Sequence, residues 1–300
     1  MSRRVVVGVD GGGTKTLALV AGLDGQRLGQ GLAGASNYNA VGFEAACREI
    51  EAAIQRALES APGEVSAVCL GLAGAGRPED VERFLRWGGE KFPAAVLKVV
   101  SDVEILLACT RPGPALALIC GTGSIVYGRT AEGELLRAGG WGYLFGDEGS
   151  GYAIGAAALR AVMRAEDGRG AATQLTGLLL ARRGVESPQG LVRSIYGTET
   201  PRAEIAGLAE LVEQAAAQKD ALALSILNVA ANDLAEMVQA VQRRLGSLPL
   251  PLALTGGMIL HGSILAGLFR RACEERRLVF SSVIEVAEPV EGAVRLALGV

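Results

Sequence analysis

The sequence predicts an α/β protein made of two similar lobes with a cleft between them, and two observations lead to this prediction. Short β-like runs alternate with helical stretches along the 300 residues, as in α/β folds. A unit of strand, glycine turn, strand, acidic-Gly turn and strand also occurs twice, about 110 residues apart. Such a repeated unit indicates two lobes descended from one.

The first lobe is predicted to open with three strands, at residues 5–9, 17–23 and 27–32. Asp24-Gly25, between the second and third strands, is a favoured two-residue hairpin signal. Further along, we expect a helix at 43–58, a strand at 65–70, a helix at 78–87 and a strand at 96–100.

The second lobe repeats the strand pattern at 116–120, 125–128 and 134–137, with Glu132-Gly133 as its acidic turn. Apolar residues at helical spacing, together with good helix formers, then predict a mostly helical region. The remaining elements are expected to be helices at 152–165, 171–182, 203–217 and 221–245, a strand at 251–254, a helix from 264, a strand near 278–286 and a helix at 290–298.

Two glycine loops are the candidates for chemistry. Residues Gly11-Gly12-Gly13-Thr14-Lys15 join the first two strands, and Gly121-Thr122-Gly123-Ser124 has the same place in the second lobe. The first loop lacks the spacing and the following helix of a P-loop or a dinucleotide fingerprint. Glycines let backbone N–H groups approach phosphate oxygens, and hydroxyls add donors. We therefore predict that the loops clamp a triphosphate, with Asp10 placed for a magnesium ion.

Composition excludes several classes of protein. A net charge of −3 lacks the basic signature of a nucleic-acid binder. We expect no membrane span, because no apolar run approaches ~20 residues, and the run that ends before Asp10 is too short for a signal peptide. His261 is the only histidine, which argues against a His-based triad or multi-His metal site. The five cysteines form no C-x-x-C pair and are interpreted as reduced core residues of a cytosolic protein.

Several motifs together resemble one family. DGGGTKT at 10–16, CGTGS at 120–124 and GGWGYLFGDEGSG at 139–151 resemble those of the sugar kinase/actin/heat-shock-70 ATPase superfamily. More narrowly, they resemble the N-acetylglucosamine kinases grouped with BadF/BadG/BcrA/BcrD-type ATPases. The resemblance covers nearly the whole chain, and ASN at 35–37, SD at 101–102 and TGG at 255–257 complete the set.

The resemblance implies a two-lobed ribonuclease H-like (actin-like ATPase) fold with a central cleft. Residues 1–114 with 287–300 would form the lobe that holds the first phosphate loop and the sugar and base residues. Residues 115–286 would hold the second phosphate loop, the sugar loop and the adenosine-binding turn. The implied activity is an ATP-dependent amino-sugar kinase that uses Mg²⁺ and phosphorylates N-acetylglucosamine at the 6-hydroxyl.

The resemblance also implies roles for single residues. By the family pattern Asp102 is the base that accepts the proton of the sugar hydroxyl, although a Ser-Asp pair before an apolar helix also reads as a cap. Gly256-Gly257 would face the adenine and ribose, although a plain strand-to-helix turn fits equally. Lys15 either reaches a phosphate or stays solvated. Residues expected at the sugar are Asn37, Asp102, Ser124, Gly140, Trp141, Gly142, Asp147 and Glu148.

Alternative interpretations remain open for several of these positions. Trp141 either stacks on a pyranose or fills core, and Asp147 and Glu148 either read hydroxyls or favour a helix N-terminus. Glucosamine and N-acetylmuramic acid kinases are close alternatives for the activity. An ATPase activator of a dehydratase or reductase is a more distant one, because the cysteines form no recognisable cluster set. A sugar, ATP and a second copy of the chain are the expected partners, and we expect no nucleic acid and no membrane.

Overall fold

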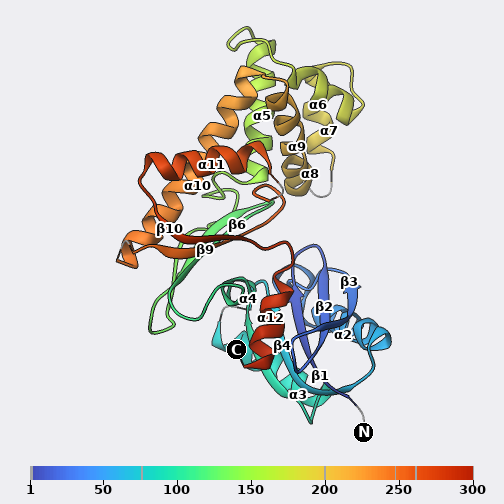
Figure 1. Ribbon diagram of the computed structural model, residues 1–300. Helices are drawn as coiled ribbons and strands as arrows, with labels where there is room; N and C mark the ends of the chain where they lie inside the picture. Colours follow the sequence, from blue (N-terminus) through green and yellow to red (C-terminus); the bar gives the residue numbers. More distant parts are fainter. Residues whose placement is uncertain (1–2, 76, 199–200, 247, 261, 300) are drawn as a thin grey trace. The chain divides into compact units, whose positions relative to one another are not determined.

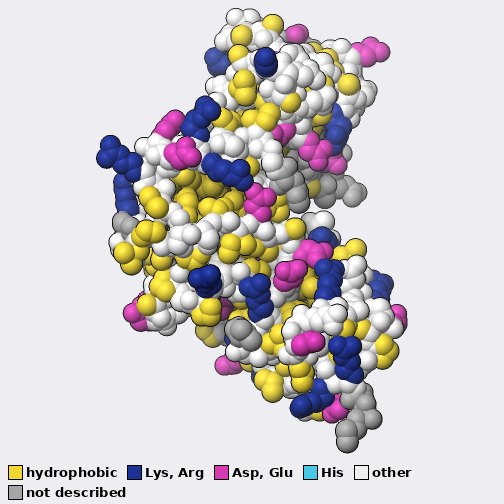
Figure 2. All heavy atoms as spheres, in the orientation of Figure 1, with side chains coloured by type: hydrophobic (Ala, Val, Ile, Leu, Met, Phe, Trp, Pro, Cys, Tyr) yellow, Lys and Arg dark blue, Asp and Glu magenta, His cyan; other side chains and the backbone are white. Residues whose placement is uncertain are grey.

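The fold is described from a computed structural model, which covers residues 3–75, 77–198, 201–246, 248–260 and 262–299. His261 lies outside the described residues. The chain forms two compact units (Figure 1): unit 1 is Met1–Pro112 with Glu288–Val300, and unit 2 is Gly113–Ala287. In the view of Figure 2, basic and acidic side chains are interspersed over the surface, in keeping with the small net charge.

Unit 1 is built on a five-stranded sheet of order β3-β2-β1-β4-β5, in which β1 is antiparallel to β2 and parallel to β4. The strands are β1 (Arg4–Gly11), β2 (Thr16–Gly22), β3 (Arg27–Ala33), β4 (Glu64–Leu72) and β5 (Val96–Ser101). The helices are α1 (Tyr38–Val41), α2 (Phe43–Ser60), α3 (Pro78–Lys91), α4 (Asp102–Ala108) and α12 (Val290–Leu298).

Helices cover both faces of this sheet, which explains why β1 is apolar along almost its whole length. Successive strand residues point to opposite faces. Val5 and Val7 pack in the cluster that contains α2, whereas Val6 packs against α12. The approach of α12 is close, because a Cβ on Gly8 would lie 2.5 Å from the backbone nitrogen of Val294. A glycine in the middle of β1 therefore lets α12 lie against the sheet.

Unit 2 repeats this sheet with the order β10-β9-β6-β7-β8. Its first three strands again form an antiparallel meander, and β9 pairs with β6 in parallel, as β4 pairs with β1. The strands are β6 (Ala115–Cys120), β7 (Ser124–Arg129), β8 (Leu135–Gly139), β9 (Leu250–Thr255) and β10 (Phe280–Glu285). The helices are α5 (Gly151–Glu166), α6 (Leu175–Arg183), α7 (Pro188–Tyr196), α8 (Pro201–Gly207), α9 (Ala209–Ala217), α10 (Ala221–Arg244) and α11 (Ile264–Glu275).

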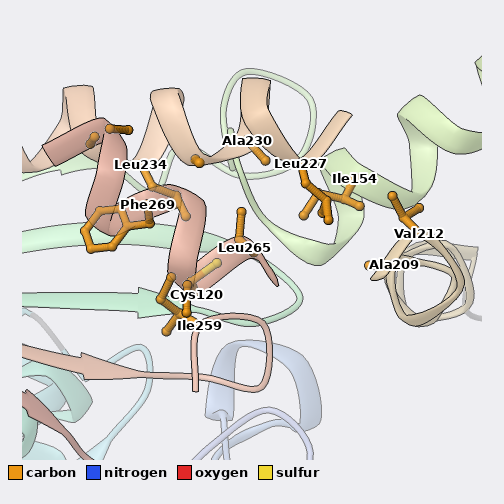
Figure 3. Packing of buried hydrophobic residues seen from close by; sticks show 14 of the residues in the cluster. Cys120, Ile154, Ala209, Val212, Leu227, Ala230, Leu234, Ile259, Leu265 and Phe269 are labelled. Atoms are coloured by element: carbon orange, nitrogen blue, oxygen red, sulfur yellow. The ribbon is translucent and has the colours of Figure 1, made fainter. Parts of the chain in front are cut away.

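The core of unit 2 lies between the sheet and these helices. Figure 3 shows Leu234 of α10 and Phe269 of α11 in the same cluster as Cys120, the last residue of β6. By length and composition alone α10 is a candidate membrane-spanning helix, although Asn228, Asp233 and Glu236 interrupt its apolar residues. Ten of its residues, Leu227 among them, are buried in the interior of unit 2, which is the role of a core helix.

The structure corrects several predicted elements. The helix predicted at 203–217 is broken into α8 and α9, because Gly207 is a poor helix former. The helix predicted from 171 begins only at Leu175, and α7 was not predicted although Pro188 stands at its N-terminus. The two acidic-Gly turns are longer than two residues. In unit 1 β2 ends at Gly22 and β3 begins at Arg27, and in unit 2 β7 ends at Arg129 and β8 begins at Leu135.

Candidate active site

Two acidic residues of unit 1 lie at one edge of its sheet. The parallel strands β1, β4 and β5 end together, with Asp10 in register with Gly71 and Leu72 in register with Ser101. Asp102 is the first residue of α4, directly after β5. The sheet thus brings Asp10 and Asp102, which are far apart in sequence, to the same edge.

The two carboxyl groups share a poorly solvated environment. Burial raises the pKa of Asp10 from 3.8 to about 6; the nearby Asp102 adds to this rise and Lys15 opposes it. Burial also raises the pKa of Asp102, while backbone N–H groups of Val103 and of Asp102 itself lower it. A proton or a cation close to these carboxyl groups would relieve their repulsion.

The cap of α4 is Ser101 and not Asp102, so the interpretation of Asp102 as the capping residue is wrong. The Ser101 backbone N–H and hydroxyl both donate to the Glu104 carboxylate at 2.9 Å, in the capping-box arrangement. Because Ser101 and Glu104 supply the cap, the Asp102 carboxyl is not needed to cap the N-terminus of α4.

The segment after β3 supports the first glycine loop through backbone hydrogen bonds. The carbonyl oxygen of Gly12 accepts hydrogen bonds from the backbone N–H groups of Ser36 and Asn37, both at 3.0 Å. A Cβ on Gly11 would lie 2.5 Å from the Ser36 hydroxyl oxygen, whereas one on Gly13 would meet nothing within 4 Å. Gly11 is therefore required for packing, and the exposed tip at 13–15 has room for a ligand.

Asn37 joins this loop through its backbone, and its side chain has a local role as well. The Asn37 side-chain oxygen accepts from the backbone N–H of Asn39 at 3.2 Å and caps α1. The residue is partly exposed. Its amide can also donate, so a sugar contact from Asn37 stays a prediction.

The second glycine loop is supported by the chain around α5. The Gly121 N–H donates to the Gly123 carbonyl at 2.9 Å, and the Gly121 carbonyl accepts from Gly151 at 2.8 Å. The Ser124 hydroxyl donates to the Glu148 carbonyl at 2.6 Å. Ser124 is buried and its hydroxyl proton is already used, so any sugar contact would have to use the oxygen as an acceptor.

The predicted sugar loop exposes its tryptophan. The Trp141 side chain is 63% exposed, with the Arg137 guanidinium carbon 4.2 Å from its ring centre, so the alternative that Trp141 fills core is wrong. Gly140 and Gly142 have φ of +69° and +82°, a region where glycine is favoured. The loop is therefore bent at both sides of an accessible aromatic ring.

The two acids of this loop lie in different environments. Asp147 is buried and pairs with Arg202 of α8 at 2.9 Å. Glu148 is exposed, and it contributes to the raised pKa of Asp233 on α10, for which burial is the larger cause. Neither Arg202 nor Asp233 was predicted from the sequence, because each lies far along the chain in a helix without a motif. Contacts of Asp147 and Glu148 with sugar hydroxyls stay a prediction.

The turn after β9 needs one of its two glycines for packing. Gly256 has φ of +105°, and a Cβ there would lie 2.2 Å from the Cys120 carbonyl oxygen. At Gly257 a Cβ would meet nothing within 4 Å. The next helix begins only at Ile264, so the turn does not lead directly into a helix. Contact of this turn with adenosine stays a prediction.

The cysteines agree with the interpretation as core residues. All five are buried, and burial raises their thiol pKa values to about 11 or 12. Among the described residues, no group of three or more His, Cys, Asp or Glu side chains is arranged to hold a metal ion.

Comparison with known proteins identifies the family. The model of the BadF/BadG/BcrA/BcrD ATPase family matches residues 7–297. The chain belongs to this family. An N-acetylmuramic acid/N-acetylglucosamine kinase of Clostridium acetobutylicum is 37% identical over 277 residues, covering 89% of this chain and 90% of the relative. An N-acetyl-D-glucosamine kinase of Dictyostelium discoideum is 33% identical and covers 99% of each chain.

A solved structure agrees with these relatives. A Chromobacterium violaceum protein, provisionally described as an N-acetylglucosamine kinase, matches with a TM-score of 0.72 and 31% identity. The match covers 99% of this chain and 100% of that one. The predicted family and the α/β, actin-like ATPase fold class are therefore confirmed, as is the enzyme class, a phosphotransferase with an alcohol acceptor.

Proposed function

We propose that this BadF/BadG/BcrA/BcrD family protein is an ATP-dependent amino-sugar kinase that phosphorylates N-acetylglucosamine at the 6-hydroxyl. The observation that carries the proposal is the position of Asp102, a carboxyl with a raised pKa beside Asp10 at the sheet edge. The two curated relatives with the highest coverage are both named as kinases of N-acetylated amino sugars. N-acetylmuramic acid and glucosamine are the alternative substrates.

In this proposal Asp102 acts as the general base. The 6-hydroxyl oxygen forms a bond to the γ-phosphorus of ATP, the bond from that phosphorus to the β,γ-bridging oxygen breaks, and ADP leaves. The hydroxyl proton moves to the Asp102 carboxylate, whose raised pKa makes it a better proton acceptor than an ordinary aspartate. The enzyme's contribution is mainly positioning and charge compensation.

Asp10 fits the role of a magnesium ligand. Its carboxylate oxygens are of the kind that Mg²⁺ prefers, and its pKa of about 6 shows that a negative charge there lacks compensation. A bound magnesium ion would offset phosphate charge. Gly13, Thr14 and Lys15 in the first loop, and Thr122 and Gly123 in the second loop, are each assigned to phosphate through N–H groups and hydroxyls. Gly12 and Gly121 would allow close approach only, because their N–H groups already donate to the Lys15 and Gly123 carbonyls.

The sugar and the adenosine would be held by the remaining predicted residues. We assign the accessible Trp141 ring to stacking on the pyranose, and Asn37, Asp147 and Glu148 to its polar groups. Gly257, around which a Cβ would have open space, is assigned to the adenosine turn with Gly256. We also propose that the protein is cytoplasmic, since five reduced cysteines suit a reducing compartment. We propose in addition that it forms a homodimer, which light scattering after size exclusion tests.

The activator alternative finds no support in the described residues. An activator would need thiols that two subunits can present to a shared iron–sulfur cluster. Here the thiols are buried, and their raised pKa values disfavour the thiolate that binds iron.

The test is a coupled ADP-release assay with Mg-ATP and four sugars: N-acetylglucosamine, N-acetylmuramic acid, glucosamine and glucose. Asp102→Asn should lower kcat by about 10²–10⁴-fold, the usual contribution of a general base. Ser101→Ala serves as the matched control, because it removes the cap of the same helix and should cost about 1 kcal/mol of stability but little kcat. ADP release that ignores every sugar, or that survives Asp102→Asn, would refute the proposal.

A further inference from the structure

Arg202 lies where two predicted binding loops of unit 2 meet. One terminal nitrogen of its guanidinium is 2.9 Å from the Asp147 carboxylate. A Cβ on Gly123 would lie 3.0 Å from the same nitrogen, and 2.9 and 3.0 Å from the two Asp147 carboxylate oxygens. The guanidinium carbon is also 5.5 Å from the centre of the Tyr143 ring. Arg202 therefore contacts the sugar loop and lies against the second glycine loop at once.

Asp147 holds this arginine in a defined position. The aspartate is 3% exposed and adopts φ of +59°, a conformation that residues other than glycine rarely adopt. A buried carboxylate needs a partner, and Arg202 supplies the opposite charge. The contact therefore fixes the guanidinium at the edge of the glycine loop.

The pairing leaves Arg202 able to bind a second group. A guanidinium carries five N–H donors in a planar fork, and the contact with Asp147 uses one nitrogen. The Arg202 side chain is 46% exposed. An anion beside the loop could thus be bound without breaking the ion pair.

We propose that Arg202 binds the nucleotide phosphates at the second glycine loop. This inference rests on the proposed function, which places phosphates at Gly121, Thr122 and Gly123. Backbone N–H groups there supply partial charges, and the guanidinium adds a full positive charge in the planar geometry that suits phosphate oxygens. The ligand class is a nucleoside di- or triphosphate.

Charge also determines which ligand is favoured. Neutral sugars have no group that needs a guanidinium, whereas N-acetylmuramic acid carries a carboxylate that could use one. Phosphate is favoured because the arginine nitrogen lies against Gly123. Binding of the acidic sugar through Arg202 is therefore the outcome that would overturn the proposal.

The test is calorimetric titration of the full chain with adenosine, Mg-ADP, a non-hydrolysable Mg-ATP analogue and N-acetylmuramic acid. Arg202→Met should weaken binding of the two phosphate ligands about 10- to 100-fold, as expected for a hydrogen bond to a charged group, and leave adenosine unchanged. Arg182→Met is the matched control, because the Arg182 side chain is about as exposed as that of Arg202 and also pairs with an acid, Glu210, in the same unit.

Three outcomes would overturn the inference: unchanged Mg-ADP binding in Arg202→Met, an equal loss for adenosine, or a loss confined to N-acetylmuramic acid. Thermal denaturation shows whether Arg202→Met is folded. If it is not, the double variant Asp147→Asn with Arg202→Gln removes the buried charge as well. Its nucleotide binding is then compared with that of Asp147→Asn alone. Nucleotide binding requires no sugar, so absence of sugar-dependent turnover in the wild type would refute the proposed function and leave this test intact.

Discussion

The two glycine loops occupy equivalent places in the two sheets, after β1 in unit 1 and after β6 in unit 2, but their charged neighbours differ. Beside the first loop, Asp10 and Asp102 raise the local negative charge, and Lys15 is the nearby cation that lowers the Asp10 pKa. Beside the second loop, the acid Asp147 is paired with Arg202 at 2.9 Å.

The difference suggests a division of labour between two otherwise similar supersecondary units. A pair of under-compensated carboxyl groups suits a cation and a proton acceptor, whereas a glycine loop with a fixed guanidinium suits phosphate. The same strand-turn-strand unit thus lies beside two under-compensated acids in one copy and beside an acid–arginine ion pair in the other. Single substitutions beside each loop can test this contrast.

The largest stability effect is expected for the glycines that pack behind the loops. Gly256→Ala should destabilise unit 2 by about 3 kcal/mol or more, because it combines overpacking against the Cys120 backbone with a left-handed φ. Gly11→Ala should cost about 1–3 kcal/mol, since it meets the Ser36 and Leu72 side chains. Chemical denaturation measures both, and a larger loss for Gly11→Ala would reverse the predicted order.

The stability of the protein should respond in opposite directions to neutralisation of Asp10 and of Asp147. The folded-state pKa of Asp10 is raised from 3.8 to about 6, so its charge costs stability progressively as pH rises between these values, by at most about 3 kcal/mol. Asp10→Asn should therefore stabilise the ligand-free protein, and the gain should grow from pH 5 to pH 8. Asp147→Asn should instead destabilise it by about 1–2 kcal/mol, because the ion pair with Arg202 is lost.

Thermal melts at pH 5 and pH 8 without magnesium measure this contrast; each kcal/mol moves Tm by about 2–4 °C in a protein of this size. Asp10→Asn should also abolish turnover despite its higher Tm. A Tm gain for Asp10→Asn that does not change with pH would show that the raised pKa is not its cause.

The smallest stability effect is expected at the open tips of the loops. A Cβ on Gly13 or Gly121 would meet nothing within 4 Å, so alanine at either position should change stability by less than about 1 kcal/mol. If phosphate oxygens lie against these backbones, the KM for ATP should still rise several-fold. An unchanged KM in both variants would mean that these glycines serve the turns alone.

Prediction from sequence succeeded where a local pattern carries the information. Apolar runs and turn residues located the ten strands within a few residues, and the final helix was predicted at its observed bounds. It failed where the deciding contact is non-local. The exposure of Trp141 depends on packing against other elements, which periodicity does not report. The division of 203–217 into α8 and α9 was missed although Gly207 is a local signal for it.

The sequence by itself determined the repeated sheet unit, the two glycine loops and the motifs that place the chain in its family, because each depends on residues close together in the chain. Only the tertiary structure decided which charges meet. Asp10 and Asp102 come together because parallel strands end at one edge, and Asp147 meets Arg202 because α8 packs near the second loop. Electrostatic interactions depend on distance and burial in space, so the charge pattern of each loop could not be predicted from spacing in the sequence.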